Sequence, residues 1–89
     1  MPLQRETVIR NKEGLHFRPI MQFVDVASRF CARVTVHCEE RDADACSPME
    51  LLMLVATQGT RLKVVANGAD AAEALDALIA LIDSGFNED

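Results

Sequence analysis

Two stretches of this chain alternate apolar and polar residues with period two, the pattern of half-buried strands. They are residues 32–38 and residues 61–66. Residues 3–10 read as a first strand, and residues 43–46 as a short, weak partner strand. In the two alternating strands, the side chains predicted to face the protein core are Val34, Val36, Cys38, Leu62, Val64 and Ala66. The sequence therefore predicts four strands.

Helical periodicity, with apolar residues at i, i+3, i+4 and i+7, begins at Phe17. The run Ser47-Pro48-Met49-Glu50 combines an N-cap serine, a first-turn proline and the glutamate of a capping box, so it predicts a short second helix. Asp70 and Glu73 are a similar pair and predict the start of a last helix that ends at Gly85. The predicted apolar faces are Ile20, Phe23, Val24 and Ala27; Leu51, Leu52 and Leu54; and Ala71, Leu75, Leu78, Ile79 and Ile82.

The predicted order is β-α-β-β-α-β-α, joined by short polar turns at residues 11–15 and 39–42. Runs of short strands with three helices favour an α+β sandwich, with the helices on one face of a four-stranded, mostly antiparallel sheet. A length of 89 residues fits one domain, residues 1–89. Because one core uses all of the apolar faces, we expect a monomer.

Composition narrows the range of partners. The formal net charge of −5 argues against nucleic acid and against an anionic membrane surface, because both need clustered cations. A helix that spans a bilayer needs about 20 consecutive apolar residues, and no apolar run in this sequence approaches that length. The polar N-terminus does not resemble a signal or transit peptide. We therefore expect a cytoplasmic protein that binds neither membrane nor nucleic acid.

The three cysteines are Cys31, Cys38 and Cys46. Their number is odd and their spacing contains no C-x-x-C, so neither a disulfide framework nor a tetrahedral metal site follows. Cys38 shares the apolar side of its strand and is interpreted as a small buried hydrophobe. We expect no metal and no cofactor.

The most informative stretch is residues 11–20, where His16 lies between a glycine loop and the start of a helix. The first amides of a helix lack intrahelical partners and favour anions, and here they belong to Phe17 and Arg18. The Arg18 guanidinium adds a cation that matches phosphate oxygens. Neutral imidazole is a competent nucleophile near neutral pH. These residues point to covalent phosphorylation of His16, and the alternative is an ordinary loop histidine.

The segment Gly14-Leu15-His16-x-Arg18-Pro19 resembles the active-site signature of the HPr phosphocarriers of bacterial phosphotransferase systems. The resemblance runs the full length, because Ser47 before a short apolar helix and the order of elements also match this family of open-faced sandwiches. Three further segments resemble the nitrogen-branch, or NPr, type of the family. They are Asn11-Lys12-x-Gly14, Leu52-Met53-Leu54 and the tail, residues 79–89.

The resemblance implies that His16 accepts a phosphoryl group on Nδ1 and that Arg18 supports the phosphate. The donor would be an Enzyme I-type protein charged by phosphoenolpyruvate, and the acceptor an EIIA-type protein. The protein would then be a carrier in a regulatory phosphotransferase system rather than an enzyme. The sequence departs from the sugar branch at Asp25 and Glu50, where carriers of that branch often present lysines.

Several other residues carry weaker expectations. Ser47 matches a serine that a dedicated kinase phosphorylates in some HPr proteins, although its role in a near-ideal helix cap is the favoured explanation. His37, Glu88 and Asp89 are interpreted as solvated. A predicted docking patch around His16 comprises Phe17, Met21, Pro48, Met49 and Leu52, with the alternative that Met49 and Leu52 belong to the core.

The second functional hypothesis is an HPr-like regulator that controls a partner by docking. In that case phosphorylation of His16 would only switch its affinity, or would not occur. The two hypotheses differ in whether a phosphoryl group passes from His16 to an EIIA-type acceptor.

Overall fold

The computed structural model describes residues 2–88. Its sheet consists of β1 (Leu3–Val8), β2 (Arg33–Cys38), β3 (Arg41–Asp44) and β4 (Arg61–Asn67) in the order β1-β4-β2-β3. All three pairings are antiparallel. The predicted four-stranded sheet is confirmed.

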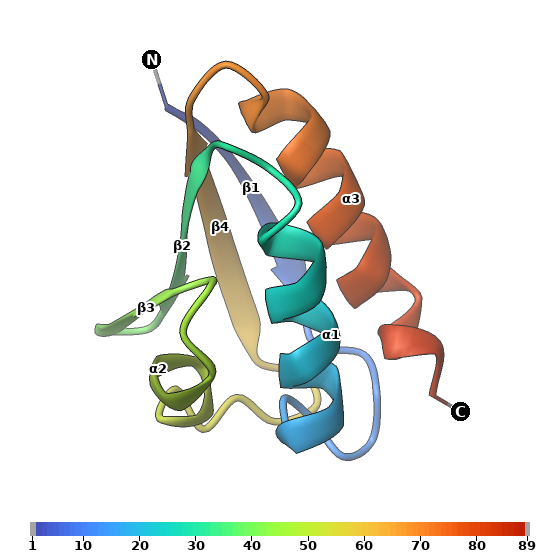
Figure 1. Ribbon diagram of the computed structural model, residues 1–89. Helices are drawn as coiled ribbons and strands as arrows, with labels where there is room; N and C mark the ends of the chain where they lie inside the picture. Colours follow the sequence, from blue (N-terminus) through green and yellow to red (C-terminus); the bar gives the residue numbers. More distant parts are fainter. Residues whose placement is uncertain (1, 89) are drawn as a thin grey trace.

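Three helices follow the predicted order, namely α1 (Phe17–Ala27), α2 (Pro48–Leu52) and α3 (Ala71–Asp83). α1 and α3 lie side by side over one face of the sheet, and α2 packs beside α1 and β3 (Figure 1). A short 3-10 turn, η1 (Gly85–Asn87), brings the chain end toward the start of α1. The predicted open-faced α+β sandwich is confirmed.

The core lies between the sheet and the helices. It is formed by every second side chain of the strands and by the apolar faces of the helices. Val36 is paired with Val64 and Val34 with Ala66, so the predicted inward positions of β2 and β4 are neighbours. All of these side chains are buried, as are Ile20 and Phe23 of α1 and Leu75, Leu78 and Ile82 of α3. Alternation and helical spacing thus predicted most of the core, because both patterns depend only on local geometry. Three positions of the predicted helix faces differ, since Val24 and Ile79 are half-buried and Leu52 is exposed.

The edges of the elements differ from the predictions. β1 ends at Val8 rather than at residue 10, and β3 spans residues 41–44 rather than 43–46. The turn before β3 has only two residues, because Glu39 adopts a positive φ of 58° and Cys38 is already paired with Arg41. The residues predicted as a four-residue polar turn therefore include the start of a strand.

The second helix has the predicted cap but not the complete capping box. The Ser47 hydroxyl accepts a hydrogen bond from the Glu50 amide at 3.3 Å. The Glu50 carboxylate turns away from the Ser47 amide and accepts the Asp44 amide at 2.9 Å, because the Ser47 amide already donates to the Asp44 carbonyl. Glu50 therefore ties α2 to the end of β3.

The predicted side-chain cap of α3 is wrong. Asp70 does precede the helix, but its carboxylate accepts the backbone amides of Cys31 and Ala32, each at 2.8 Å. The hydrogen bond from the Cys31 amide is the main reason that the pKa of Asp70 lies below its usual value, against a smaller opposing effect of burial. Asp70 thus fastens the loop before β2 to the start of α3.

Candidate functional site

His16 occupies the N-cap position of α1 with an extended backbone, φ −94° and ψ −171°. The loop that presents it packs against the segment before β4, because the Leu15 amide donates to the Ala56 carbonyl at 2.9 Å. Gly14 has a φ of +72°, and a Cβ there would lie 2.6 Å from the Ala56 carbonyl oxygen. Only glycine fits this turn, so the glycine in the motif positions His16.

The start of α1 is open. Among residues 2–88 no side chain caps it, and its first turn carries no acidic residue. The Ile20 amide donates to the His16 carbonyl at 3.0 Å and Pro19 has no N–H, whereas the amides of Phe17 and Arg18 have no partner within the described chain. The Arg18 side chain is exposed. The structure therefore places the imidazole at a helix start with two free amides, and the next basic residue in the sequence, Arg18, lies in the first turn of that helix.

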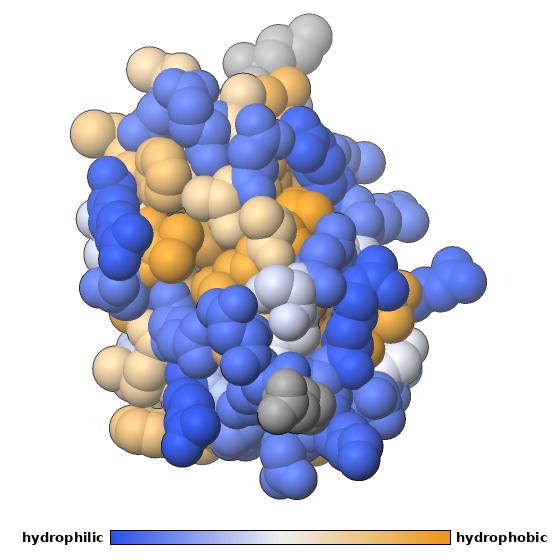
Figure 2. Space-filling view, turned by 90° about the vertical axis from the view of Figure 1, so that its right-hand side faces the viewer, coloured by the Kyte–Doolittle hydropathy of each residue, from blue (hydrophilic) through white to orange (hydrophobic). Residues whose placement is uncertain are grey.

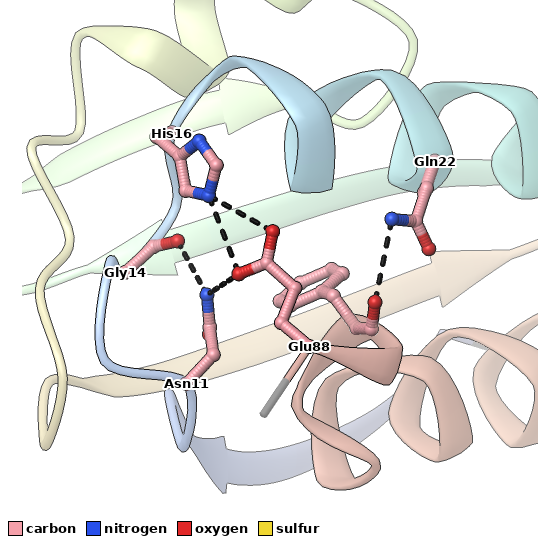
Figure 3. Close-up of polar contacts among 6 residues, drawn as sticks. Asn11, Gly14, His16, Gln22 and Glu88 are labelled. Atoms are coloured by element: carbon pink, nitrogen blue, oxygen red, sulfur yellow. Dashed lines mark hydrogen bonds and ion pairs between the residues drawn. The ribbon is translucent and has the colours of Figure 1, made fainter.

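A carboxylate from the far end of the chain completes the site. His16 Nε2 lies 3.1 Å from Oε2 and 3.3 Å from Oε1 of Glu88 (Figure 3). Asn11 Nδ2 donates to Glu88 Oε1 at 3.0 Å and to the Gly14 carbonyl at 2.8 Å, so it joins the tail to the histidine loop. The His16 side chain is 39% exposed and that of Glu88 only 15%.

The expectation that Glu88 is solvated is therefore wrong, and Asp89 lies outside the described residues. The contact joins positions 72 apart, and no local pattern signals it. Partial burial acts to raise the pKa of Glu88. Hydrogen bonds from Asn11 and His16, with the positive charges of His16 and Arg18, outweigh that effect and lower the pKa. Glu88 is thus an ionised carboxylate beside the imidazole at neutral pH.

The residues of the predicted docking patch are on the surface. Exposed fractions are 71% for Phe17, 42% for Met21, 67% for Met49 and 49% for Leu52, so the alternative that Met49 and Leu52 belong to the core is wrong. Leu51 and Leu54 fill the core under α2 instead. A shallow depression between α1 and α2 is lined by Phe17, which follows His16 in the chain, and by Ile20, Pro48, Met49 and Leu52. The structure therefore gathers four of the five predicted docking residues at one surface, and Met21 is exposed on the same helix as Phe17.

Other predicted features lie outside this site. His37, expected to be solvated, contacts the Asp42 carboxylate across the β2–β3 pair. Cys38 is buried as predicted, and burial raises the pKa of its thiol. Residues 2–88 hold no cluster of three or more acidic, histidine or cysteine side chains that could bind a metal. None of the described helices is long and apolar enough to cross a membrane.

A family model for the phosphorylation site of the HPr component of the phosphotransferase system matches residues 3–84. The chain belongs to the HPr family. It is 41% identical to the phosphocarrier protein NPr of Proteus mirabilis, with both chains covered completely. The structure superposes on an HPr from Thermoanaerobacter tengcongensis with a TM-score of 0.94, at 38% identity and 98% coverage of each chain. A crystal structure described as an HPr dimer from that organism matches with a TM-score of 0.78, at 40% identity and 92% and 94% coverage.

These findings confirm the predicted family and its resemblance to the NPr type. This HPr-family protein is a phosphocarrier of the phosphotransferase system, not an enzyme that turns over a substrate. Family membership also explains why an exposed histidine lies beside a helix start that nothing else in the described chain fills.

Proposed function

We propose that His16 accepts a phosphoryl group from an Enzyme I-type protein charged by phosphoenolpyruvate and passes it to an EIIA-type protein. The observation that carries this proposal is the position of His16 at the uncapped start of α1. The free amides of Phe17 and Arg18 and the exposed Arg18 side chain offer donors to the phosphoryl oxygens.

The chemistry needs no group beyond these residues and the donor. A lone pair on a ring nitrogen of His16 attacks the phosphorus, a P–N bond forms, and the bond between phosphorus and the donor breaks. In the onward step the acceptor attacks the same phosphorus and the P–N bond breaks, returning the pair to the ring. The amides and Arg18 stabilise the charge on the phosphoryl oxygens throughout.

The partners would dock on the exposed apolar residues around His16. Phe17 of α1 and Met49 of α2 flank the depression between these helices, and large exposed apolar side chains are typical of transient interfaces. The NPr relatives support a nitrogen-related, regulatory system. Asp25 and Glu50, both exposed, stand where sugar-branch carriers often present lysines, which also favours a branch other than sugar transport.

We further propose that residues 1–89 act as one domain and as a cytoplasmic monomer. Figure 2 shows an apolar area on the face around α3 with hydrophilic side chains around it. The support for a monomer is that the buried apolar side chains of the sheet and the helices form one core cluster. Because one related HPr has been crystallised as a dimer, sedimentation of this protein at several concentrations is the direct test.

Intact-protein mass after incubation with phosphoenolpyruvate and a nitrogen-branch Enzyme I tests the carrier function. We expect a gain of one phosphoryl group that is labile in acid and absent in His16→Ala. His37→Ala removes the other histidine of the chain and is the matched control, which should still gain the group.

Transfer of the group from the purified phosphoprotein to an EIIA-type protein tests the second half of the proposal. Absence of any mass gain with both nitrogen-branch and sugar-branch donors would refute the carrier function and favour the docking regulator. Equal gains in wild type and His16→Ala would place the phosphoryl group elsewhere.

A further inference from the structure

The C-terminal segment folds back onto the histidine loop and is anchored at three points. The Phe86 side chain is 1% exposed, so it is part of the core. Gln22 Nε2 donates to the Phe86 carbonyl at 3.3 Å (Figure 3). Gly85, at a φ of +68°, faces Asn11. These three contacts hold the segment in a position where the Glu88 carboxylate contacts His16.

Asn11 fixes the orientation of this carboxylate. The Asn11 side chain is 3% exposed, and its Nδ2 faces two acceptors, the Gly14 carbonyl and Glu88 Oε1. The reverse orientation of the amide would set an oxygen against both acceptors, so the hydrogen bonds dictate the one observed. Oδ1 of Asn11 is buried without a partner within the described chain, so the side-chain hydrogen bonds of Asn11 are the two from Nδ2.

An ionised carboxylate only accepts hydrogen bonds, so the atom of His16 that faces Glu88 must carry a hydrogen. That atom is Nε2, at 3.1 Å and 3.3 Å from the two carboxylate oxygens. In a neutral imidazole with its hydrogen on Nε2, the lone pair lies on Nδ1.

We propose that Glu88 is a positioning residue for phosphoryl transfer. Its carboxylate holds the hydrogen of His16 on Nε2, orients the ring, and leaves Nδ1 as the attacking atom. This inference rests on the proposed function of His16 as the phosphoryl acceptor, and it adds the chain end to the site.

The charge balance of the reaction explains what Glu88 contributes. When neutral imidazole with a hydrogen on Nε2 forms a bond from Nδ1 to phosphorus, the ring becomes cationic. Glu88 then faces that positive charge and stabilises it, much as a carboxylate supports the imidazolium of a catalytic histidine. When the P–N bond breaks in the onward step, the ring returns to neutral with the hydrogen still on Nε2. No proton needs to leave or enter in either direction.

Nitrogen NMR of the unphosphorylated protein tests the positioning directly. In wild type at alkaline pH, where imidazole is neutral, we expect a protonated Nε2 signal and an unprotonated Nδ1 signal from His16. In Glu88→Ala and Glu88→Gln we expect both signals to move toward the values of a mixture of the two tautomers. Glu40→Gln, in the turn between β2 and β3, is the matched control and should keep the wild-type signals.

The initial rate of phosphorylation by the Enzyme I-type donor is the second measurement. We expect Glu88→Ala to lose about tenfold in rate, as is common when a partner that orients a histidine is removed. The thermal midpoint reports whether each variant is folded. A wild-type tautomer in Glu88→Ala, whatever its rate, would overturn the positioning role, and so would a variant that is phosphorylated as fast as wild type or faster.

This pair of measurements separates the two proposals. If wild type and variant both fail to take up a phosphoryl group, the proposed function is refuted, whereas the tautomer still shows whether Glu88 positions His16. If wild type is phosphorylated and the tautomer does not depend on Glu88, only the present inference is refuted.

Discussion

The N-termini of α1 and α2 both contribute to the depression at Phe17 and Pro48, but within residues 2–88 only that of α2 has a side-chain cap. At α2, the Ser47 hydroxyl caps the Glu50 amide, Pro48 fills the first position, and Glu50 places a negative charge in the first turn. At α1, His16 occupies the cap position without a side-chain hydrogen bond to the helix, and the first turn contains Arg18 in place of an acid. We call the capped start of α2 the closed helix start and the uncapped start of α1 the open helix start.

The difference separates stability from function. A side-chain cap contributes about 1 kcal/mol to a helix, and α1 does without it. Burial of Pro19, Ile20, Phe23 and Ala27 holds α1 in place instead, because most of the stability of a helix in a protein comes from its packed face. The amides of Phe17 and Arg18 therefore have no side-chain partner within the described chain.

A charge reversal at the open helix start should have the largest effect. In Arg18→Glu we expect phosphorylation by the Enzyme I-type donor to fall by about a hundredfold, because a carboxylate would repel the phosphoryl group that the site must bind. The same change should leave the free energy of unfolding equal or about 0.5 kcal/mol higher, since an acid suits a helix N-terminus. Arg18→Ala, which only removes the cation, should lose about tenfold in rate.

Initial rates and urea unfolding of the same samples check this prediction. Opposite signs for activity and stability would distinguish the anion site from general damage to the fold. If Arg18→Glu were phosphorylated at the wild-type rate, the open helix start would have no role in binding the phosphoryl group.

The docking surface should give the next largest effect, and it tests whether the closed helix start has only a structural role. Phe17 lies on α1 and Met49 on α2, with exposed fractions of 71% and 67%. We expect either change to alanine to raise the KM for the donor by about tenfold, because exposed apolar anchors dominate small interfaces. Leu3→Ala, on β1 and 44% exposed, is the matched control.

Steady-state kinetics at varied carrier concentration measure this effect. An increase for Phe17→Ala alone would limit the interface to α1 and leave α2 a structural role only. An equal increase for Leu3→Ala would show that the effect is not specific to the patch.

Substitutions at the closed helix start, that of α2, should change the free energy of unfolding. In Ser47→Ala we expect the free energy of unfolding to fall by about 1 kcal/mol, because the Glu50 amide loses its partner. Ser47→Asp should stay within about 0.5 kcal/mol of wild type, since aspartate caps as well as serine does. Ser84→Ala, which removes a hydroxyl that donates to the Leu81 carbonyl, is the control and should change stability less than Ser47→Ala.

Urea unfolding measures all three variants. A stable Ser47→Ala would show that the cap contributes little and would strengthen the hypothesis that Ser47 is retained as a phosphorylation site. A loss in both Ser47→Ala and Ser47→Asp would indicate that the hydroxyl, rather than the cap, matters.

The sequence predicted what depends on local geometry. Period two and period 3.6 predicted the strands, the helices and most of their buried faces, with Leu52 as an exposed exception, and the motif around His16 predicted the open helix start. The contacts of Asp70 and Glu88 could not be predicted in this way, because their partners lie 38 to 77 positions away. Asp70 looked like a helix cap and Glu88 like a solvated tail. Each instead fastens two distant segments, and a carboxylate of either kind looks the same in sequence.

These two long-range carboxylates should make the protein less stable in acid, which is the smallest of the expected effects. Both have a pKa below the usual value in the folded state. A carboxyl with a lowered pKa on folding binds fewer protons when folded than when unfolded, so its contribution to stability is full above the unfolded pKa. That contribution is lost as the pH falls through the folded pKa, in the region below about pH 4.

Urea unfolding between pH 7 and pH 3 measures this loss. We expect Asp70→Asn and Glu88→Gln each to reduce the fall in stability over that range, with Glu40→Gln as the control on an exposed turn. In the double variant the reduction should approach the sum of the two single reductions. The two sites are separate, because Asp70 joins the loop before β2 to α3 while Glu88 joins the tail to the His16 loop. A pH dependence that is the same in wild type and both variants would mean that neither contact distinguishes the folded from the unfolded chain. The two carboxylates would then be only neighbours of their partners, and Glu88 would lose the physical basis for positioning His16.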